Sequence, residues 1–332
     1  MWLTAGLPPS ATCQGACRTA CSAHLFRALV YLSAVLPGLL ATLLVADSGR
    51  AILEVVTVNK QTAPLNWMQL QPFGVEVAGH DVRAMSLPQL TELKQLLAWH
   101  GVVVLRGKSD VVVTDADFVE FLKRLGRLTF TQGETPVAEH PMLNVVSNVG
   151  RATPPKSVFH TDTSYVPQPP AYTALRPVVL PDAGGETVFS NQFAAYDTLP
   201  DKFKNCLAQA NVLHQVSGLP VTAGAARDAV PDAAPDQTWH PLFKVHPLSG
   251  RTALFLSTPQ RCRAVSGMSA GEAERAIKLL YQHSTRHHRL YHHHWRAGDL
   301  LMWDNRCTMH RGDHSGVVGN RVFHRGMVLA DH

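Results

Sequence analysis

The chain has 332 residues, of which 45% are hydrophobic and 17% are charged, and its formal net charge is +5 at pH 7. Without a low-complexity tract, this composition predicts a substantial buried core, in one large domain or two small ones. The positive charge is spread out and contains no run of five or more Lys or Arg residues. Because nucleic-acid binding needs a basic stripe, we expect no nucleic-acid partner.

Six cysteines occupy positions 13, 17, 21, 206, 262 and 307. The three in the body of the chain are far apart and form no Cys-x-x-Cys pair. This spacing excludes a disulfide scaffold and a cysteine zinc site, and it predicts a protein of the reducing cytoplasm.

Residues 1–67 differ in amino-acid composition from the rest of the chain. An uncharged and mostly apolar run extends from Ala28 to Ala46. It is long enough to anchor the protein in a bilayer, and it also resembles the apolar part of a secretory signal. A third interpretation is a start that lies too early, with the working protein beginning near Met68. These three alternatives stay open, and the folded domain is expected over residues 68–332.

Three amphipathic helices are predicted from apolar spacing and N-terminal capping residues. The first runs from Ser86 to about Trp99. The second begins at Thr114, which forms a capping-box pattern with Asp117, and the third begins at Ser269.

The remaining body of the chain is rich in short apolar runs: LNVVSNV, AYTALRPVVL, TVFSN, TALFLS, LLMWDN and VFHRGMVL. Pro, Gly, Asn and Asp separate these runs, a pattern typical of the strands of a sandwich or barrel. The segment from Val216 to Pro241 is instead rich in Ala, Asp, Pro and Gly. It is predicted to be a long loop, either a lid or an insertion without consequence.

His160 and Asp162 are the residues that most clearly indicate a chemical function. On a strand, residues i and i+2 face the same side, so the imidazole and the carboxylate would point into one cavity. One more imidazole would complete the set of two histidines and one carboxylate that binds non-haem iron(II). His310 follows the predicted strand LLMWDN and is a candidate for that third ligand.

Two arginines follow on another predicted strand. Arg321 and Arg325 are four residues apart, so both guanidinium groups can lie on one face of it. A guanidinium binds a carboxylate through two parallel hydrogen bonds. A dicarboxylate could therefore chelate the metal at one end and pair with arginine at the other.

From about Gln69 to Asp331 the chain resembles the taurine dioxygenase and 2,4-dichlorophenoxyacetate dioxygenase family of Fe(II)- and 2-oxoglutarate-dependent oxygenases. The motifs that carry the resemblance occur in the family's order and spacing: HGVVVLRG, FHTDTSY, GGETVFSN with AYDTLP, HPLSGRTALFLS, WRAGDLLMWDNRCTMHR and NRVFHRG. The resemblance implies a mostly β fold with flanking helices, whose core is a double-stranded β-helix, or jelly roll.

The resemblance also implies roles for single residues. The iron ligands would be His160, Asp162 and His310. Arg321 and Thr187 match the residues that bind the distal carboxylate of 2-oxoglutarate. Arg325 matches an arginine that lies near the substrate or near the other carboxylate of the cosubstrate.

By the same resemblance, the cofactors are Fe(II), 2-oxoglutarate and O2, and the reaction releases succinate and CO2 while hydroxylating a small organic molecule. Retention of Asp162 favours hydroxylation, since related halogenases have a small residue there. Two rival interpretations stay open: a catalytically silent binding or sensor protein, and a tailoring oxygenase for a larger natural product.

The substrate positions depart from the taurine-oxidising pattern. Thr131 and Glu134 stand where those relatives have a histidine and a tyrosine, and Lys156 replaces an asparagine. These differences argue against taurine. Lys156 and Arg325 together could receive an anionic group, although Lys156 is equally well explained as a solvated loop residue. We expect a small-molecule, anionic substrate and a homo-oligomeric enzyme.

A histidine cluster just before WRAGDL is the remaining candidate for a metal site. It consists of His287, His288, His292, His293 and His294. Strand alternation would divide the last three between opposite faces, so no metal role is expected.

Overall fold

The computed structural model describes residues 41–47, 50–56, 63–79, 81–107, 112–131, 133–150, 157–216, 236–286 and 290–330. The chain divides into two compact units, Met1–Val58 and Asn59–His332. The larger unit therefore begins before Met68, where the folded domain was expected to start. Leu65 is only 4% exposed and belongs to the core of this larger unit.

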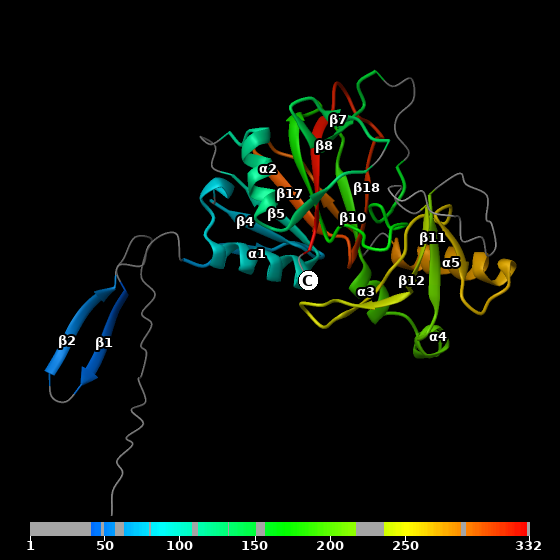
Figure 1. The fold of residues 1–332 in the computed structure, drawn as a ribbon, viewed down its shortest axis with the longest axis horizontal. Coiled ribbons are helices and arrows are strands. Elements are labelled where there is room, and N and C mark those ends of the chain that lie inside the picture. The colour runs from blue at the N-terminus through cyan, green and yellow to red at the C-terminus, as the bar shows by residue number, and fades with distance from the viewer. Residues whose placement is uncertain are drawn as a thin grey trace, which may run out of the picture. The chain divides into compact units, whose positions relative to one another are not determined.

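The described part of the smaller unit is an antiparallel hairpin of two strands, β1 (Ala41–Asp47) and β2 (Arg50–Val56) (Figure 1). The end of the predicted apolar run lies in β1, and residues 28–40 lie outside the described residues. Within the described residues, no helix has both the length and the apolar character that crossing a membrane requires.

The larger unit is built on a nine-stranded sheet. Neighbouring strands follow the order β3, β4, β5, β17, β9, β19, β8 and β7, and β6 also pairs with β19. All pairs are antiparallel except β4 with β5. The strands are β3 (Trp67–Gln69), β4 (Val75–Ala78), β5 (Val102–Arg106), β6 (Arg127–Thr129), β7 (Pro136–Val137), β8 (His140–Ser147), β9 (Tyr172–Val179), β17 (Asp299–Asp304) and β19 (Val322–Leu329).

Smaller sheets accompany this large one. A three-stranded sheet has the order β16 (Leu290–His293), β10 (Thr187–Asn191) and β18 (Thr308–Gly312). Another has the order β12 (Gln237–Pro241), β11 (Asn211–Gln215) and β15 (Cys262–Val265), and β13 (Phe243–Val245) pairs with β14 (Thr252–Leu254).

The large sheet and the β16–β10–β18 sheet share one hydrophobic cluster. Phe189 of β10 and Tyr291 of β16 pack there with Trp303 of β17 and Phe323 of β19. Two sheets joined by one apolar core form the double-stranded β-helix that the sequence predicted.

The helices gather at the two ends of the larger unit (Figure 1). The three predicted helices are confirmed as α1 (Leu87–His100), α2 (Asp115–Lys123) and α5 (Ala270–Ser284), each preceded by its predicted N-cap residue. Three short helices were not predicted: η1 (Val82–Ala84), α3 (Gln192–Asp197) and α4 (Asp201–Leu207).

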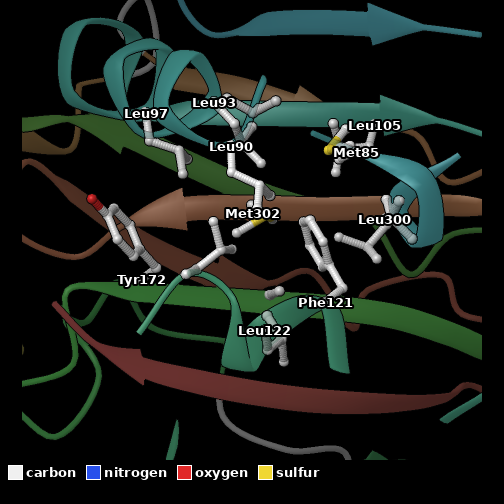
Figure 2. Packing of buried hydrophobic residues seen from close by; sticks show 14 of the residues in the cluster. Met85, Leu90, Leu93, Leu97, Leu105, Phe121, Leu122, Tyr172, Leu300 and Met302 are labelled. Carbon is white, nitrogen blue, oxygen red and sulfur yellow. The ribbon is translucent and has the colours of Figure 1, made fainter. Parts of the chain in front are cut away.

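Strands β5 and β17 are buried on both faces. Leu300 and Met302 point into a cluster with α1 and α2, whereas Leu301 and Trp303 point into the cluster between the sheets. Figure 2 shows Leu300 and Met302 converging with side chains of α1 and α2. This double burial explains why the sequence of β17 is a continuous apolar run rather than an alternating one.

The long loop expected from Val216 to Pro241 is shorter than predicted. Its last residues, Gln237–Pro241, form β12, which pairs in antiparallel register with β11. This strand is short and polar and has no local apolar pattern that would predict it. It is defined instead by backbone hydrogen bonds to β11, which is distant in sequence. Residues 217–235 lie outside the described residues.

Candidate active site

His160 and His310 are brought together by backbone pairing. His160 N donates to the carbonyl of His310 at 2.9 Å, and His310 N donates back to the carbonyl of His160 at 3.0 Å. This isolated bridge sets the two imidazole rings 4.3 Å apart, centroid to centroid. His310 itself lies on β18, where it pairs with Phe189 of β10.

Asp162 reaches the same point through a turn. The sequence predicted that His160 and Asp162 share one face of a strand, but the chain turns directly after the His160 bridge. Thr163 takes a left-handed φ of 39°, which a non-glycine residue adopts rarely. The tight turn, rather than strand alternation, places the carboxylate beside the histidines.

The three side chains converge on one point. Asp162 Oδ1 lies 3.6 Å from His160 Nε2 and 3.8 Å from His310 Nε2, and the three candidate ligand atoms lie within 4.8 Å of one another. These separations are longer than a hydrogen bond, and they suit donor atoms that share a cation.

The hydrogen bonding of His160 fits metal binding. Its Nδ1 lies 3.0 Å from the carbonyl oxygen of Val158, which can only accept. Nδ1 therefore carries the proton, and the lone pair of Nε2 faces Asp162. A ligating histidine is oriented in this way when its other nitrogen donates to a carbonyl.

Burial sets the protonation of this group. It lowers the pKa of His310 to about 3, in spite of the nearby Asp162 carboxylate. Burial would raise the pKa of the Asp162 carboxyl, but the two histidines and Arg325 hold it well below its usual range. At neutral pH the site thus offers a neutral imidazole and an ionised carboxylate, the forms that bind a divalent metal.

A buried chain of hydrogen bonds fixes the second oxygen of Asp162. Thr173 Oγ1 donates to Asp162 Oδ2 at 2.8 Å and accepts from Asn305 Nδ2 at 2.8 Å. Asn305 Oδ1 accepts in turn from the indole N–H of Trp303 at 3.1 Å. The Trp303 ring also lies 4.4 Å from the His310 ring. Nothing in the sequence indicated a role for Thr173.

Arg321 is a buried cation next to the β10 segment. It is 2% exposed, and its Nε donates to the carbonyl of Gly185 at 3.0 Å. Burial lowers its pKa to about 10, and among the described residues no ion pair to a carboxylate offsets this effect. A guanidinium held in this way suits the carboxylate of a bound ligand. Thr187, also predicted for that ligand, follows Gly185 on the same segment and is 1% exposed.

Gly185 permits the close approach of Arg321. Its φ is +80°, and a Cβ at this position would lie 3.1 Å from Arg321 Cδ and 2.9 Å from Pro181 Cγ. Glycine is therefore required at this position both by the backbone angle and by the neighbouring guanidinium stem.

Arg325 lies beside Asp162 of the candidate metal-ligand group. Its Nη1 is 3.4 Å from Asp162 Oδ1, and its Nη2 is 3.5 Å from Asn144 Oδ1. Nη2 also lies 3.6 Å from Glu134 Oε1, an ion pair that the sequence did not reveal. A register shift between Val322 and Phe323 interrupts the regular alternation that was expected between the two arginines.

A pocket of about 410 Å³ opens beside the turn that follows Asp162, and Arg325 is not among the residues that line it. Thr163 and Tyr165, from the turn after Asp162, line it together with Thr131. Thr131 Oγ1 contacts the sulfur of Met327 at 3.7 Å, two residues beyond Arg325. Lys156, the other expected anion-binding residue, lies outside the described residues.

A second group with metal-ligand side chains has a structural explanation. His246 Nε2 lies 2.9 Å from Asp304 Oδ2, and its Nδ1 accepts from backbone N–H groups at 3.2 and 3.3 Å. Arg306 pairs with the same carboxylate at 2.5 Å, and Cys307 Sγ lies 3.7 Å from the Asp304 carbonyl. These contacts satisfy the group and brace the turn between β17 and β18.

The histidine cluster divides as the sequence predicted. His293 is buried, with Nε2 3.2 Å from Asp299 Oδ2. His292 and His294 instead contact the two oxygens of Glu186 at 2.9 and 3.0 Å. His287 and His288 lie outside the described residues.

A jelly roll that brings two histidines and one carboxylate together defines a class of non-haem iron oxygenases. Residues 66–327 match the family described as taurine catabolism dioxygenase TauD, TfdA family. The chain belongs to this family and is a 2-oxoglutarate-dependent dioxygenase that uses Fe(II), 2-oxoglutarate and O2.

Individual relatives agree with this assignment. The chain is 33% identical over 195 residues to an alpha-ketoglutarate-dependent 2,4-dichlorophenoxyacetate dioxygenase of Burkholderia sp. (strain RASC), covering 58% of this chain and 63% of the relative. It is 28% identical over 281 residues to the protein of the same description from Cupriavidus pinatubonensis, covering 78% of this chain and 95% of the relative.

Among solved structures, the chain is similar to AAD-2 in complex with Mn(II) and N-oxalylglycine. The TM-score is 0.66 at 26% sequence identity, and the match covers 81% of this chain and 98% of that one.

Proposed function

We propose that His160, Asp162 and His310 bind the iron, and that Arg321 and Thr187 hold the distal carboxylate of 2-oxoglutarate. The observation that carries this proposal is the convergence of two imidazole nitrogens and one carboxylate oxygen within 4.8 Å at a largely buried point. Bound Fe(II) would supply the activation of O2 that couples decarboxylation of 2-oxoglutarate to oxidation of a C–H bond.

The chain's own residues prepare this chemistry. The carbonyl of Val158 holds His160 in the tautomer that presents Nε2. Trp303 and Phe189 pack around the His310 ring, at 4.4 and 6.2 Å between ring centroids, and keep water from that side. The buried charge of Arg321 would orient the cosubstrate so that its other end reaches the metal.

We propose that the substrate is a small organic molecule with an anionic group, which would be received by Arg325 and hydroxylated with release of succinate and CO2. Relatives of this chain are named for 2,4-dichlorophenoxyacetate, for a sulfate ester and for a sulfonate. The pocket of about 410 Å³ lined by Thr131, Thr163 and Tyr165 has room for such a compound. A catalytically silent binding protein is not favoured, because such a protein would need no buried cosubstrate arginine. Cytoplasmic localisation, self-association and the absence of a nucleic-acid partner stay predictions of the sequence.

The cosubstrate assignment is tested by steady-state formation of succinate, which we expect to proceed slowly even without a prime substrate. Arg321→Met should raise the KM for 2-oxoglutarate by roughly tenfold to a hundredfold, as expected for a lost charge-assisted hydrogen bond. Arg127→Met, which removes an exposed arginine on β6, is the matched control. An unchanged KM in folded Arg321→Met would contradict the assignment.

A further inference from the structure

Arg325 is paired with two carboxylates and is not a free cation. Its two terminal nitrogens are directed at carboxylates, Nη1 at Asp162 Oδ1 (3.4 Å) and Nη2 at Glu134 Oε1 (3.6 Å). The distances exceed those of tight ion pairs, so the groups are close enough to interact and far enough apart to admit another partner. An anionic substrate group that approaches Arg325 must therefore also approach Glu134.

The two carboxylates differ in their surroundings. Asp162 is 3% exposed and is oriented toward the two histidines and Thr173, so its charge belongs to the metal site. The Glu134 side chain is 42% exposed, against 12% for Arg325. Glu134 is thus the carboxylate that a molecule entering from solvent would meet beside Arg325.

The pocket wall adds no compensating positive charge among the described residues. Its lining combines apolar side chains with polar ones, and its charged member is Asp236; the polar residues are Thr129, Thr131, Thr163, Tyr165 and Gln168. Arg261 lies behind the ring of Tyr165, 5.3 Å from the centroid, and its Nη1 donates to the Thr161 carbonyl at 3.2 Å. This cation is therefore turned toward the backbone.

We infer that the substrate is a zwitterion, which places its anionic group on Arg325 and a protonated amine on Glu134. This inference rests on the proposed function and deepens it, because it adds a cationic group to the anionic substrate. A substrate that carries only an anionic group would be attracted by Arg325 and repelled by Glu134. A zwitterion could pair its anionic group with Arg325 and its ammonium group with Glu134. Glu134 would then be a specificity-determining residue.

The test uses two sets of three compounds, and the members of each set share one carbon skeleton. The aromatic set is 4-phenylbutanoate, 4-phenylbutylamine and 2-amino-4-phenylbutanoate. The aliphatic set is pentanoate, pentylamine and 2-aminopentanoate. Each is added to iron-loaded enzyme with 2-oxoglutarate, and the stimulation of succinate release over the substrate-free rate is measured. The variants are Glu134→Gln and, as a matched control, Glu139→Gln, an exposed glutamate on the same hairpin that lines a different pocket.

In the wild type and in Glu139→Gln, the amino acids should stimulate succinate release at concentrations about fivefold lower than the anions, as expected for one additional ion pair at a partly exposed site. Glu134→Gln should abolish this preference. The inference is overturned if the plain anions stimulate as well as the amino acids do, if no amino acid stimulates at all, or if Glu134→Gln keeps the preference.

The substrate-free rate distinguishes a failure of the zwitterion inference from a failure of the proposed function. If succinate forms slowly without any added compound but the amino acids have no advantage, the dioxygenase assignment of the site holds and the zwitterion inference fails. If iron-loaded enzyme forms no succinate under any condition, the proposed function itself fails.

Discussion

At the scale of single residues, the Asp162 carboxylate is oriented by a hydrogen bond from a side-chain hydroxyl group rather than from a backbone amide. The Thr173 hydroxyl donates to Asp162 and passes the connection on to Asn305. Loss of a group that orients a metal ligand in this way typically lowers metal affinity by about ten- to a hundredfold.

Thr173→Val should therefore weaken iron binding by roughly ten- to a hundredfold, because it removes the donor to Asp162 and keeps the side-chain volume. Titration with Fe(II) under anaerobic conditions measures the effect. The matched control is Thr91→Val on α1, whose hydroxyl bonds only to the helix carbonyl of Leu87. Equal iron affinity in the wild type and Thr173→Val would show that the hydrogen bond does not support the ligand.

Gly185→Ala should displace Arg321 and weaken 2-oxoglutarate binding, since the added methyl group would lie 3.1 Å from Arg321 Cδ. Gly250→Ala is a control for backbone strain: its φ is +68°, and nothing lies within 4 Å of the new Cβ. Both variants should lose about 1–2 kcal/mol of stability from the left-handed backbone. Only Gly185→Ala should raise the KM for 2-oxoglutarate, and a parallel rise in Gly250→Ala would refute the steric explanation.

The sequence predicts which three side chains converge at the candidate site because its spacing and motifs are local. His160 and Asp162 are two residues apart, and the motifs around His310 resemble those of one family. The Glu134–Arg325 pair is different: nothing near Glu134 marks it as a partner for a residue on β19. Only the folding of the β6–β8 segment against that strand brings the two together.

At the scale of elements, helix α1 anchors one face of the large sheet. Leu93 and Leu97 are fully buried and pack with residues of β5 and β17 (Figure 2). The helix is bounded by a capping box at Ser86 and by Gly101, whose φ is +76°. These local signals explain why the sequence predicted this helix closely.

Leu93→Ala should destabilise the protein by about 2–5 kcal/mol, because it removes apolar contacts and leaves a cavity between helix and sheet. Chemical denaturation followed by circular dichroism measures this change. Leu87→Ala, at a position that is 73% exposed on the same helix, should change stability by no more than about 0.5 kcal/mol. Similar losses in both variants would mean that the packing of α1 on the sheet contributes little.

Elements that depend on distant partners were predicted less well. Helices α3 and α4 have six and seven residues, too few for an amphipathic pattern to be distinctive. Strand β12 lies at the end of a segment rich in loop-forming residues, and pairing with β11 defines it. Tertiary contacts determine whether these elements form, and such contacts are difficult to predict from a single sequence.

At the scale of the whole molecule, buried neutral histidines couple stability to pH. Burial lowers the pKa of His240 to about 4, and it holds the pKa of His214 well below its ordinary value. The two rings lie 5.4 Å apart, and both ring nitrogens of His214 are buried without a hydrogen-bond partner. The unfolded chain would bind protons on both histidines near pH 6.5.

Stability should therefore fall as the pH decreases from about 6.5 toward 4, because the unfolded state binds protons that the folded state excludes. Each such histidine contributes a slope of up to about 1.4 kcal/mol per pH unit over this window. His214→Phe replaces one of them with an aromatic ring and should flatten the dependence of the melting temperature on pH. A slope that is unchanged in this variant would exclude His214 as a source.

The most direct test of the central claim is the visible metal-to-ligand charge-transfer band that forms when 2-oxoglutarate chelates Fe(II) in the absence of oxygen. The wild type and a control with the half-buried histidine of β8 removed, His140→Ala, should show the band after Fe(II) and 2-oxoglutarate are added. His160→Ala should lose it, and Arg321→Ala should require a much higher concentration of 2-oxoglutarate. A wild-type protein that binds iron but gives no band, or a His160→Ala variant that retains it in full, would contradict the assignment of this site.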